Sequence, residues 1–393
     1  MAKSNRIATN RNNTENWVKM ASLLVQIDGT GGVQGVPFCV WGPPAAAKSA
    51  KLKAIGRVLG KKVKVFLGSS AEPTDLAIPV PDLERGTVRR LVQSWAKDLK
   101  EEGGILFLDE ASSSPPAMQA ALMSVTHDRM MGDEDISNVA VVMAANPVDI
   151  AAGGNEIALP MLNRMLHMFV QTPPAKEVGQ YLSGEFAGND TDSQLKVPVL
   201  DPDRYKRELF RVGVIQQAFL SRKSGVFEVD LKGIVPSIEP AFPSPRSWEL
   251  GMRAFAAGVA VDDVELATEM LACAVGDGVA GEFSAFRTAV DLPDTEALLD
   301  GRIKWTPDPA RADRTMTVLL GVAAEAIRRM KETDIERAWD LLTVVGDAKD
   351  LAIPAAENLT TIRTAQFKGK KVPKMGPVEA RVKIAIGQYM VRE

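Results

Sequence analysis

The stretch VWGPPAAAKSAKLKAIG, residues 40–56, contains the residue types of a phosphate-binding loop. An apolar run leads into a Gly-Pro turn, and Lys48 and Ser49 follow at the start of a helix-like segment. In such loops, backbone N–H groups at the helix start converge on oxygen anions, a lysine reaches the outer phosphates, and a hydroxyl group ligates Mg²⁺. We therefore expect a phosphate site, with Lys48 on the phosphates and Ser49 on the metal.

Alanine replaces the glycines that such a loop normally carries. Ala47 stands directly before the lysine, and Ala45 occupies a second usual glycine position. A left-handed alanine costs roughly 1–2 kcal/mol, which weakens the motif without forbidding it. We expect glycine at both positions to tighten nucleotide binding. Taken alone, the loop is equally compatible with a strand–turn–helix junction that binds no ligand.

Two acidic residues and an amide follow two later apolar runs. Asp109 and Glu110 end the run GGILFLDE, and Asn146 ends VVMAAN. Parallel strands would bring all three to the sheet edge that holds Lys48. One carboxylate can then hold Mg²⁺ through water, the next can polarise a hydrolytic water, and the amide can position that water beside a γ-phosphate. A strand ending in solvated acids and an Asn-Pro turn are the alternatives, but the loop and acids together predict a nucleotide site.

The elements that must position these residues alternate along the first half of the chain. Apolar runs predict strands and 3.6-residue periodicity predicts helices, which together indicate a parallel sheet covered by helices. The expected strands are 36–41, 62–68, 104–110, 138–146 and the end of 159–170, and the expected helices are 46–60, 86–103, 115–129 and the start of 159–170. Helical patterns dominate after residue 174. We expect a tail at 1–15, an α/β domain at 16–173, a helical domain at 174–290 and a helical extension at 291–393.

Composition excludes several classes of protein. Of the 393 residues, 46% are hydrophobic and 25% charged, and the net charge is -3, so nothing global favours nucleic acid. The two cysteines, Cys39 and Cys273, cannot form a disulfide framework, and Cys39 is expected to be a buried apolar residue. No apolar run has membrane-spanning length, and the polar start has no signal-peptide core. We expect a cytoplasmic protein with no membrane partner and a disordered first dozen residues.

As a set, these motifs resemble the AAA+ ATPases, and among them the MoxR-like branch. The segments GPPAAAKS, LFLDEASSSPPAMQAALM, AANPVDIAAGGNEIALPMLNRM and SPRSWE occur in that family's order, from about residue 36 to 255. The resemblance implies an AAA+ P-loop core, with a parallel sheet sandwiched by helices, followed by an α-helical lid and a further helical region. It implies an ATP-binding set of Gly42, Pro43, Pro44, Ala45, Ala46, Ala47, Lys48, Ser49, Ala50 and Asp109.

The resemblance also implies a catalytic set. Glu110 matches the Walker B glutamate, Asn146 sensor 1, Arg164 the arginine finger given to a neighbouring subunit, and Arg246 sensor 2 on the lid. Mg²⁺ would be held by Ser49 and Asp109. By residue type alone each arginine has an ordinary structural role, in which Arg164 pairs with a surface acid or Arg246 caps a helix. The order of the motifs favours the catalytic roles.

The function implied is Mg-dependent ATP hydrolysis in an oligomeric ring, expected to be a hexamer, that remodels or matures a protein partner. In this family the partner is often a separate von Willebrand A domain protein. The segments 69–95 and 128–141 match the family's helix-2 insert and pre-sensor loop, which typically face the centre of a ring. One alternative is a nucleotide-gated scaffold with little hydrolysis, favoured by the loop alanines. Another is a nucleic-acid motor, whose only support is local basicity at 51–64 and 367–374.

Overall fold

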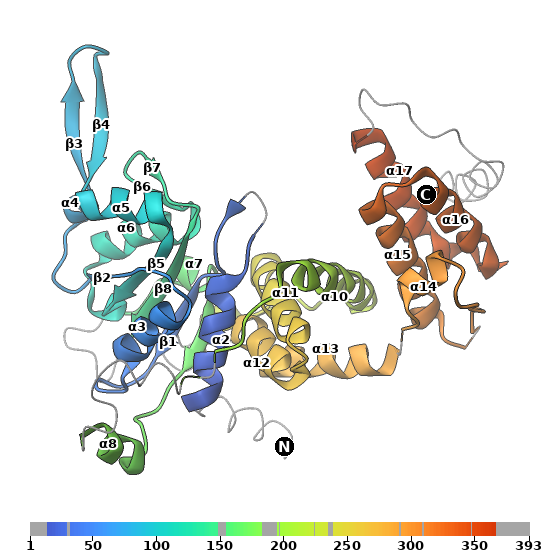
Figure 1. Ribbon diagram of the computed structural model, residues 1–393, viewed down its shortest axis with the longest axis horizontal. Helices are drawn as coiled ribbons and strands as arrows, with labels where there is room; N and C mark the ends of the chain where they lie inside the picture. Colours follow the sequence, from blue (N-terminus) through green and yellow to red (C-terminus); the bar gives the residue numbers. More distant parts are fainter. Residues whose placement is uncertain are drawn as a thin grey trace. The chain divides into compact units, whose positions relative to one another are not determined.

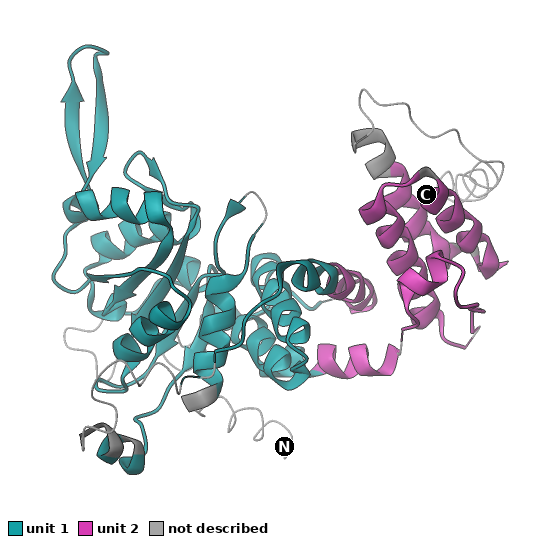
Figure 2. Ribbon diagram, in the orientation of Figure 1, with its two compact units in different colours: residues 1–209, 225–281 teal, residues 210–224, 282–393 magenta. Residues whose placement is uncertain are grey.

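A computed structural model describes most of the chain (Figure 1). The described residues are 14–29, 32–147, 155–182, 195, 197–223, 225–234, 239–290, 292–308, 310–346 and 348–366. Residues 1–13 of the expected N-terminal tail and the basic segment at 367–374 fall outside these ranges, whereas residues 14 and 15 of that tail already belong to a helix. The chain forms two compact units, which we describe separately (Figure 2). Unit 1 contains residues 1–209 and 225–281, and unit 2 contains residues 210–224 and 282–393.

Unit 1 is built on a five-stranded parallel sheet with strand order β2-β5-β8-β1-β9. The strands are β1 (Phe38–Trp41), β2 (Val63–Leu67), β5 (Gly104–Asp109), β8 (Val139–Ala145) and β9 (Leu166–Phe169). All residues of β1 and β8 are buried, as expected for strands covered on both faces. The parallel sheet predicted from the sequence is confirmed. Burial raises the pKa of the Cys39 thiol in β1, so this cysteine is the buried apolar residue that we expected.

Helices flank this sheet (Figure 1). Those of unit 1 are α2 (Thr14–Gln26), α3 (Lys48–Val58), α4 (Pro73–Leu76), α5 (Ser94–Glu102), α6 (Pro116–His127), α7 (Leu159–Leu162), α8 (Ala175–Leu182), α11 (Pro245–Ala260) and α12 (Val264–Val275), with short 3-10 turns η2 (Ala111–Ser113) and η3 (Leu231–Gly233). On one face, Leu122 and Val125 of α6 share a buried cluster with Leu106 and Val141 of the sheet. Alternate strand residues share a face, so α6 is held against β5 and β8.

The helix predicted over residues 86–103 is wrong in its first half. Thr87–Val92 forms strand β4, which pairs antiparallel with β3 (Ala77–Asp82), and the helix α5 begins only at Ser94. The β-branched residues favour a strand, and the turn between the strands contains Gly86 in the left-handed region. This β3–β4 hairpin occupies the segment assigned to the helix-2 insert. A second hairpin, β6 (Met130–Met131) with β7 (Glu134–Asp135), occupies the pre-sensor segment.

Unit 2 is helical. It contains the C-terminal part of α10 (Pro202–Arg222), most of α13 (Asp277–Val290), and α14 (Thr295–Leu299), α15 (Ala312–Arg329), α16 (Glu332–Leu342) and α17 (Ile353–Gln366), with 3-10 turns η4 (Thr343–Val345) and η5 (Lys349–Ala352). Its core includes Leu319 and Val322 of α15 with Trp339 of α16. The residues expected to form one lid, 174–290, are thus distributed over both units. No helix among the described residues is long and apolar enough to cross a membrane.

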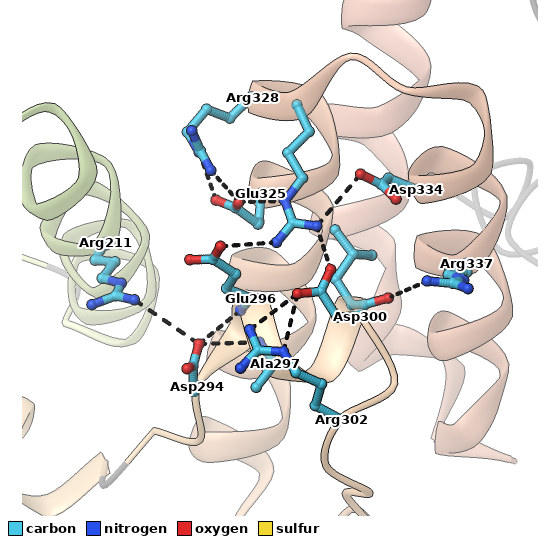
Figure 3. Close-up of polar contacts among 12 residues, drawn as sticks. Arg211, Asp294, Glu296, Ala297, Asp300, Arg302, Glu325, Arg328, Asp334 and Arg337 are labelled. Atoms are coloured by element: carbon cyan, nitrogen blue, oxygen red, sulfur yellow. Dashed lines mark hydrogen bonds and ion pairs between the residues drawn. The ribbon is translucent and has the colours of Figure 1, made fainter. Parts of the chain in front are cut away.

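A network of ion pairs joins three helices of unit 2 around Arg329, and Figure 3 labels its acidic members Glu296, Asp300, Glu325 and Asp334. Its guanidinium group pairs with Glu296 of α14, Asp300 after α14, Glu325 of α15 and Asp334 of α16. The hydrogen bond from Nε to Glu325 Oε1 is 2.8 Å long. The side chains of Glu325 and Asp334 are only 9% and 7% exposed. Glu325 is also paired with Arg328, whereas Arg329 is the only cation that pairs with Asp334 among the described residues. The hydrogen bond to Asp300 raises the pKa of Arg329, and the bond to Glu325 adds to this against the opposing effect of burial.

Arg329→Ala should therefore lower the free energy of unfolding of unit 2 by about 2–4 kcal/mol, because it leaves the buried carboxylate of Asp334 without its counter-ion. Arg302→Ala is the matched control, since Arg302 pairs with the same Asp300 but has a side chain 58% exposed. It should cost less than about 1 kcal/mol. Chemical denaturation of the full chain measures both. Equal losses in the two variants would show that Arg329 is an ordinary surface residue.

A second buried polar contact lies within the sheet of unit 1. Trp41 Nε1 donates to His167 Nδ1 at 3.1 Å, so the other ring nitrogen, Nε2, carries the proton and donates to Leu162 O at 2.9 Å. Burial lowers the pKa of His167 to about 4, although the Leu162 bond acts in the opposite direction. Protonation at Nδ1 would place two donors face to face, because the indole of Trp41 can only donate.

This pairing makes the stability of unit 1 depend on pH. The folded-state pKa of His167, about 4, lies below the ordinary 6.5, so between these values the unfolded chain binds the proton first. The contribution is fully present above pH 6.5 and is lost as the pH falls toward 4, by up to about 3 kcal/mol. The chain has two histidines, so His127→Asn leaves a single imidazole NMR signal to titrate. A midpoint near 6.5 in the folded protein would contradict this assignment.

Candidate functional site

The loop between β1 and α3 follows the carboxyl end of a central strand. Gly42 N donates to Ala145 O at 3.2 Å, which ties the loop to β8. A side chain at Gly42 would meet the carbonyl oxygen of Val170 at 2.6 Å, so the position requires glycine. Ala45 and Ala47 both have left-handed backbones, with φ of 64° and 58°. The strain expected from the two alanines is therefore present in the folded loop.

The ammonium group of Lys48 lies inside this loop. Its Nζ donates to Gly42 O at 2.6 Å, Pro43 O at 3.2 Å and Asn146 Oδ1 at 2.8 Å. The residue is 8% exposed, and all three acceptors are neutral. Burial lowers the pKa of Lys48, and the nearby charge of Asp109 acts in the opposite direction. A buried cation that has only neutral direct partners is a favourable position for an anionic ligand.

The acidic residues meet the loop from β5. Ser49 Oγ donates to Asp109 Oδ2 at 2.6 Å, so the hydroxyl and carboxylate predicted to hold Mg²⁺ are in contact. Glu110 follows in a left-handed conformation, with φ of 57°, and its carboxylate accepts a hydrogen bond from Ser69 Oγ. Ser69 comes just after β2, the neighbour of β5. The sheet order therefore brings the ends of β1, β2, β5 and β8 to one place.

These residues surround a pocket of about 600 Å³. Its lining consists of Pro44, Ala45, Ala46, Ala47, Lys48, Ser49, Ala50, Ser69, Asp109, Glu110, Ser113 and Asn146. Of the set predicted to bind ATP, Gly42 and Pro43 are absent from the lining and instead accept hydrogen bonds from the lysine. Ser69 and Ser113 are the residues that sequence reasoning missed. The available signal was their place: each follows a strand that ends at the edge holding the lysine.

The pocket is lined by the kinds of groups that bind Mg·ATP. No group of three or more His, Cys, Asp or Glu side chains among the described residues could hold a metal on its own. Mg²⁺ usually takes only one or two protein ligands and completes its shell with waters and phosphate oxygens. A single hydroxyl–carboxylate pair, Ser49 with Asp109, beside a buried ammonium group is consistent with a metal that arrives with a triphosphate.

The two predicted arginines lie away from this pocket. Asn146 follows the carboxyl end of β8, whereas Arg164 precedes the amino end of β9, at the opposite edge of the sheet. Ser244 Oγ donates to Asn163 Oδ1 at 2.6 Å, and this bond holds the start of α11, which carries Arg246, next to Arg164. Burial and then the charge of Arg246 lower the pKa of Arg164. The two arginines therefore lie close to each other although both are positively charged.

Neither arginine has an ion-pair partner within the described part of the chain. Arg164 Nη1 donates to Pro160 O at 2.5 Å, and its Nε is buried without a hydrogen-bond partner among those residues. The alternatives that we considered from sequence, a surface ion pair for Arg164 and a capping role for Arg246, have no support here. The N-cap of α11 is Ser244, whose side chain accepts from Ser247 N.

Comparison with known proteins agrees with this geometry. Residues 37–165, about a third of the chain, match a family model described as the AAA domain of the dynein-related subfamily. No curated protein sequence matches. One matching crystal structure, a "putative ATPase" from Cytophaga hutchinsonii ATCC 33406, is 11% identical, covers 63% of this chain and 74% of its own, and has a TM-score of 0.38. That likeness is too slight to carry any inference.

The family match, the parallel five-stranded sheet and the helical C-terminal part give the chain the AAA+ α/β fold with a helical extension, as predicted. The matched segment contains the loop, the acidic residues, Asn146 and Arg164. It supports nucleotide binding and ATPase activity in general.

The left-handed alanines lead to a test. Glycine at positions 45 and 47 should tighten Mg·ATP binding by up to about tenfold per position, because glycine removes strain of about 1–2 kcal/mol at each left-handed residue. Ala50→Gly, inside α3, is the matched control and should weaken the loop's helix rather than relieve strain. Calorimetric titration measures the affinity and a thermal melt measures stability. Unchanged or weaker ATP binding in the double variant would show that the loop accommodates alanine at no cost to binding.

Proposed function

We propose that this protein is a MoxR-like AAA+ ATPase that binds Mg·ATP and hydrolyses it in an oligomeric ring to remodel or mature a protein partner. The observation that carries the proposal is the convergence of Lys48, Ser49, Asp109, Glu110 and Asn146 at one sheet edge around a pocket. Each of these side chains has a role in phosphoryl transfer to water, and the fold holds all of them within one ligand's reach.

The chain's own groups would divide the work as follows. Lys48 exchanges its neutral acceptors for phosphate oxygens, and the loop N–H groups cradle the same phosphates. Ser49 and Asp109 would hold Mg²⁺, which would supply positive charge to neutralise the phosphate oxygens. Glu110 accepts a proton from the attacking water once its carboxylate turns from Ser69, and Asn146 orients that water.

Arg164 and Arg246 support a ring. They lie at the edge opposite their own pocket and next to each other, and neither forms an ion pair within 4 Å among the described residues, although the charge of Asp128 acts on Arg164. Two uncompensated guanidinium groups are suited to the developing charge of another subunit's phosphate, since an arginine finger is worth about 10³–10⁵ in rate. We propose that each subunit gives this pair to its neighbour, in a ring that the MoxR-like resemblance predicts to be hexameric.

A protein partner is the proposed object of the ring's work, with a separate von Willebrand A domain protein as the expected candidate. The β3–β4 hairpin offers a surface for it: Leu83 at its tip is 91% exposed, and Val88 is 66% exposed. The base of this hairpin is fixed, because Arg90 N donates to Asp133 Oδ2 at 2.8 Å and Asp133 N donates to Arg90 O at 3.3 Å. These bonds link it to the β6–β7 turn, so both inserts would move together.

A nucleotide-gated scaffold is the second candidate. It is favoured by the strained loop alanines and by the bond that holds Glu110 to Ser69, since both would slow hydrolysis. It differs from the first candidate in a single observable, the turnover rate in the assembled state. The nucleic-acid motor gains no support from the described residues, because Lys53 and Arg57 simply lie on the solvent side of α3.

Lys48→Ala should abolish Mg·ATP binding in calorimetry, because it removes the cation that reaches the outer phosphates. Lys53→Ala is the matched control: it removes an exposed lysine from the next turn of the same helix and should bind as wild type does. Wild-type affinity in the Lys48 variant would reject the site.

Mixing two inactive variants tests the ring. Glu110→Gln subunits keep the finger but lack the water-activating acid, and Arg164→Ala subunits have the reverse defect. Mixed rings contain some interfaces with both groups intact, so ATPase activity should reappear on mixing and rise with total protein concentration. If native mass spectrometry shows mixed rings and every mixture stays inactive, Arg164 does not act between subunits. Activity per chain that is independent of concentration down to a verified monomer would reject the ring.

A further inference from the structure

A third basic side chain lies at the edge that carries the two arginines. His127 is the last residue of α6, and two residues later Arg129 Nη1 donates to the carbonyl oxygen of Val139, the first residue of β8. The end of α6 is therefore fixed at the amino ends of the strands, the edge where Arg164 precedes β9. His127 is 39% exposed by its side chain, so its ring reaches solvent.

The charges that face His127 come from three elements. Arg246 belongs to the first turn of α11, Arg164 follows α7, Asp128 follows His127 itself, and Glu249 lies one turn after Arg246. Burial lowers the pKa of His127, and Arg246 and Arg164 lower it further against the smaller opposing effects of the two carboxylates. Asp128 Oδ1 lies 3.9 Å from the ring's Nε2, too far for a hydrogen bond.

These carboxylates do not neutralise the arginines. The side chain of Asp128 is 58% exposed, so water screens its charge. Glu249 is shared with Arg253, whose Nη1 lies 3.6 Å from Glu249 Oε1. The edge thus presents two guanidinium groups whose field adds to burial in lowering the pKa of the adjacent imidazole. An anion placed against the arginines would reverse that field at the imidazole.

We propose that His127 is a third member of the phosphate-recognising face, taking up one proton from solvent when a neighbouring subunit's triphosphate sits against Arg164 and Arg246. The imidazolium then donates to a phosphate oxygen, as charge-assisted hydrogen bonds of this kind are the strong ones. No other bond is made or broken. The inference rests on the proposed function, because it assumes that the arginine pair acts between subunits.

Proton uptake on assembly has a direct consequence. Because the assembled ring binds one more proton per interface than the free chains, assembly tightens as the pH falls, by at most about tenfold per pH unit for each interface. Histidine is suited to this role because its charge changes near neutral pH. A purely structural residue at the end of α6 would give no such linkage.

The test uses full-length chains that carry Glu110→Gln, so that added Mg·ATP is not consumed. Sedimentation velocity gives the protein concentration for half-assembly at about pH 8 and about pH 6. With His127 present, that concentration should fall on the order of tenfold toward the lower pH. His127→Gln should remove the dependence, and His127→Lys, which is always charged, should assemble tightly at both values. Calorimetry in buffers of different ionisation enthalpy should show proton uptake on assembly of the chain with His127.

Equal pH dependence in the chains with His127 and with His127→Gln, or assembly without proton uptake, would overturn the role of His127. If that happens while Arg164→Ala still weakens assembly, the arginine pair survives and only His127 is wrong. If no chain assembles with Mg·ATP at either pH, the ring of the proposed function fails, and the role of His127 fails with it.

Discussion

The buried ammonium group of Lys48 is the constraint on which the site depends. Two carbonyl groups and the amide oxygen of Asn146 satisfy its three N–H donors, but none of these acceptors carries a charge. Taking a cation out of water without a counter-charge is costly. These acceptors come from the loop and from the end of β8, so the lysine holds the start of α3 and the end of β8 together. A phosphate group is the ligand that would compensate this charge best. The lysine therefore accounts both for the contact between the loop and β8 and for the pocket's suitability for an anion.

The parallel sheet places the candidate functional residues at the two opposite ends of its strands. Strands that all run in one direction gather Asp109, Glu110 and Asn146 at their carboxyl ends and leave their amino ends to other residues. The amino-terminal edge receives Arg164 and, through the contact between Ser244 and Asn163, Arg246. A single subunit therefore carries a pocket on one side and its complement on the other. Such a surface pair is suited to a head-to-tail ring, in which each interface joins unlike edges.

Much of this could be predicted from the sequence, and the failures have physical causes. Lys48, Ser49 and Asp109 were predictable because strand ends and a helix start fix their positions locally. Residues 87–92 were predicted as helix from their pattern of apolar and basic residues. That pattern does not record the pairing with β3, which makes the segment a strand. The meeting of Arg164 with Arg246 depends on a contact between residues 81 positions apart, which no local pattern records. The place of Ser69 after a predicted strand was visible in the sequence, but its contact with Glu110 depends on the pairing of β2 with β5.

The most direct measurement of the central claim is a cryo-EM structure of the Glu110→Gln protein with Mg·ATP. We expect the γ-phosphate between Lys48 and Asn146, with Mg²⁺ on Ser49 and Asp109 and with Arg164 of the next subunit facing the same phosphate. Nucleotide bound elsewhere on the chain would contradict the site. Nucleotide in this pocket with Arg164 exposed to solvent in every copy would leave the pocket intact and contradict the ring.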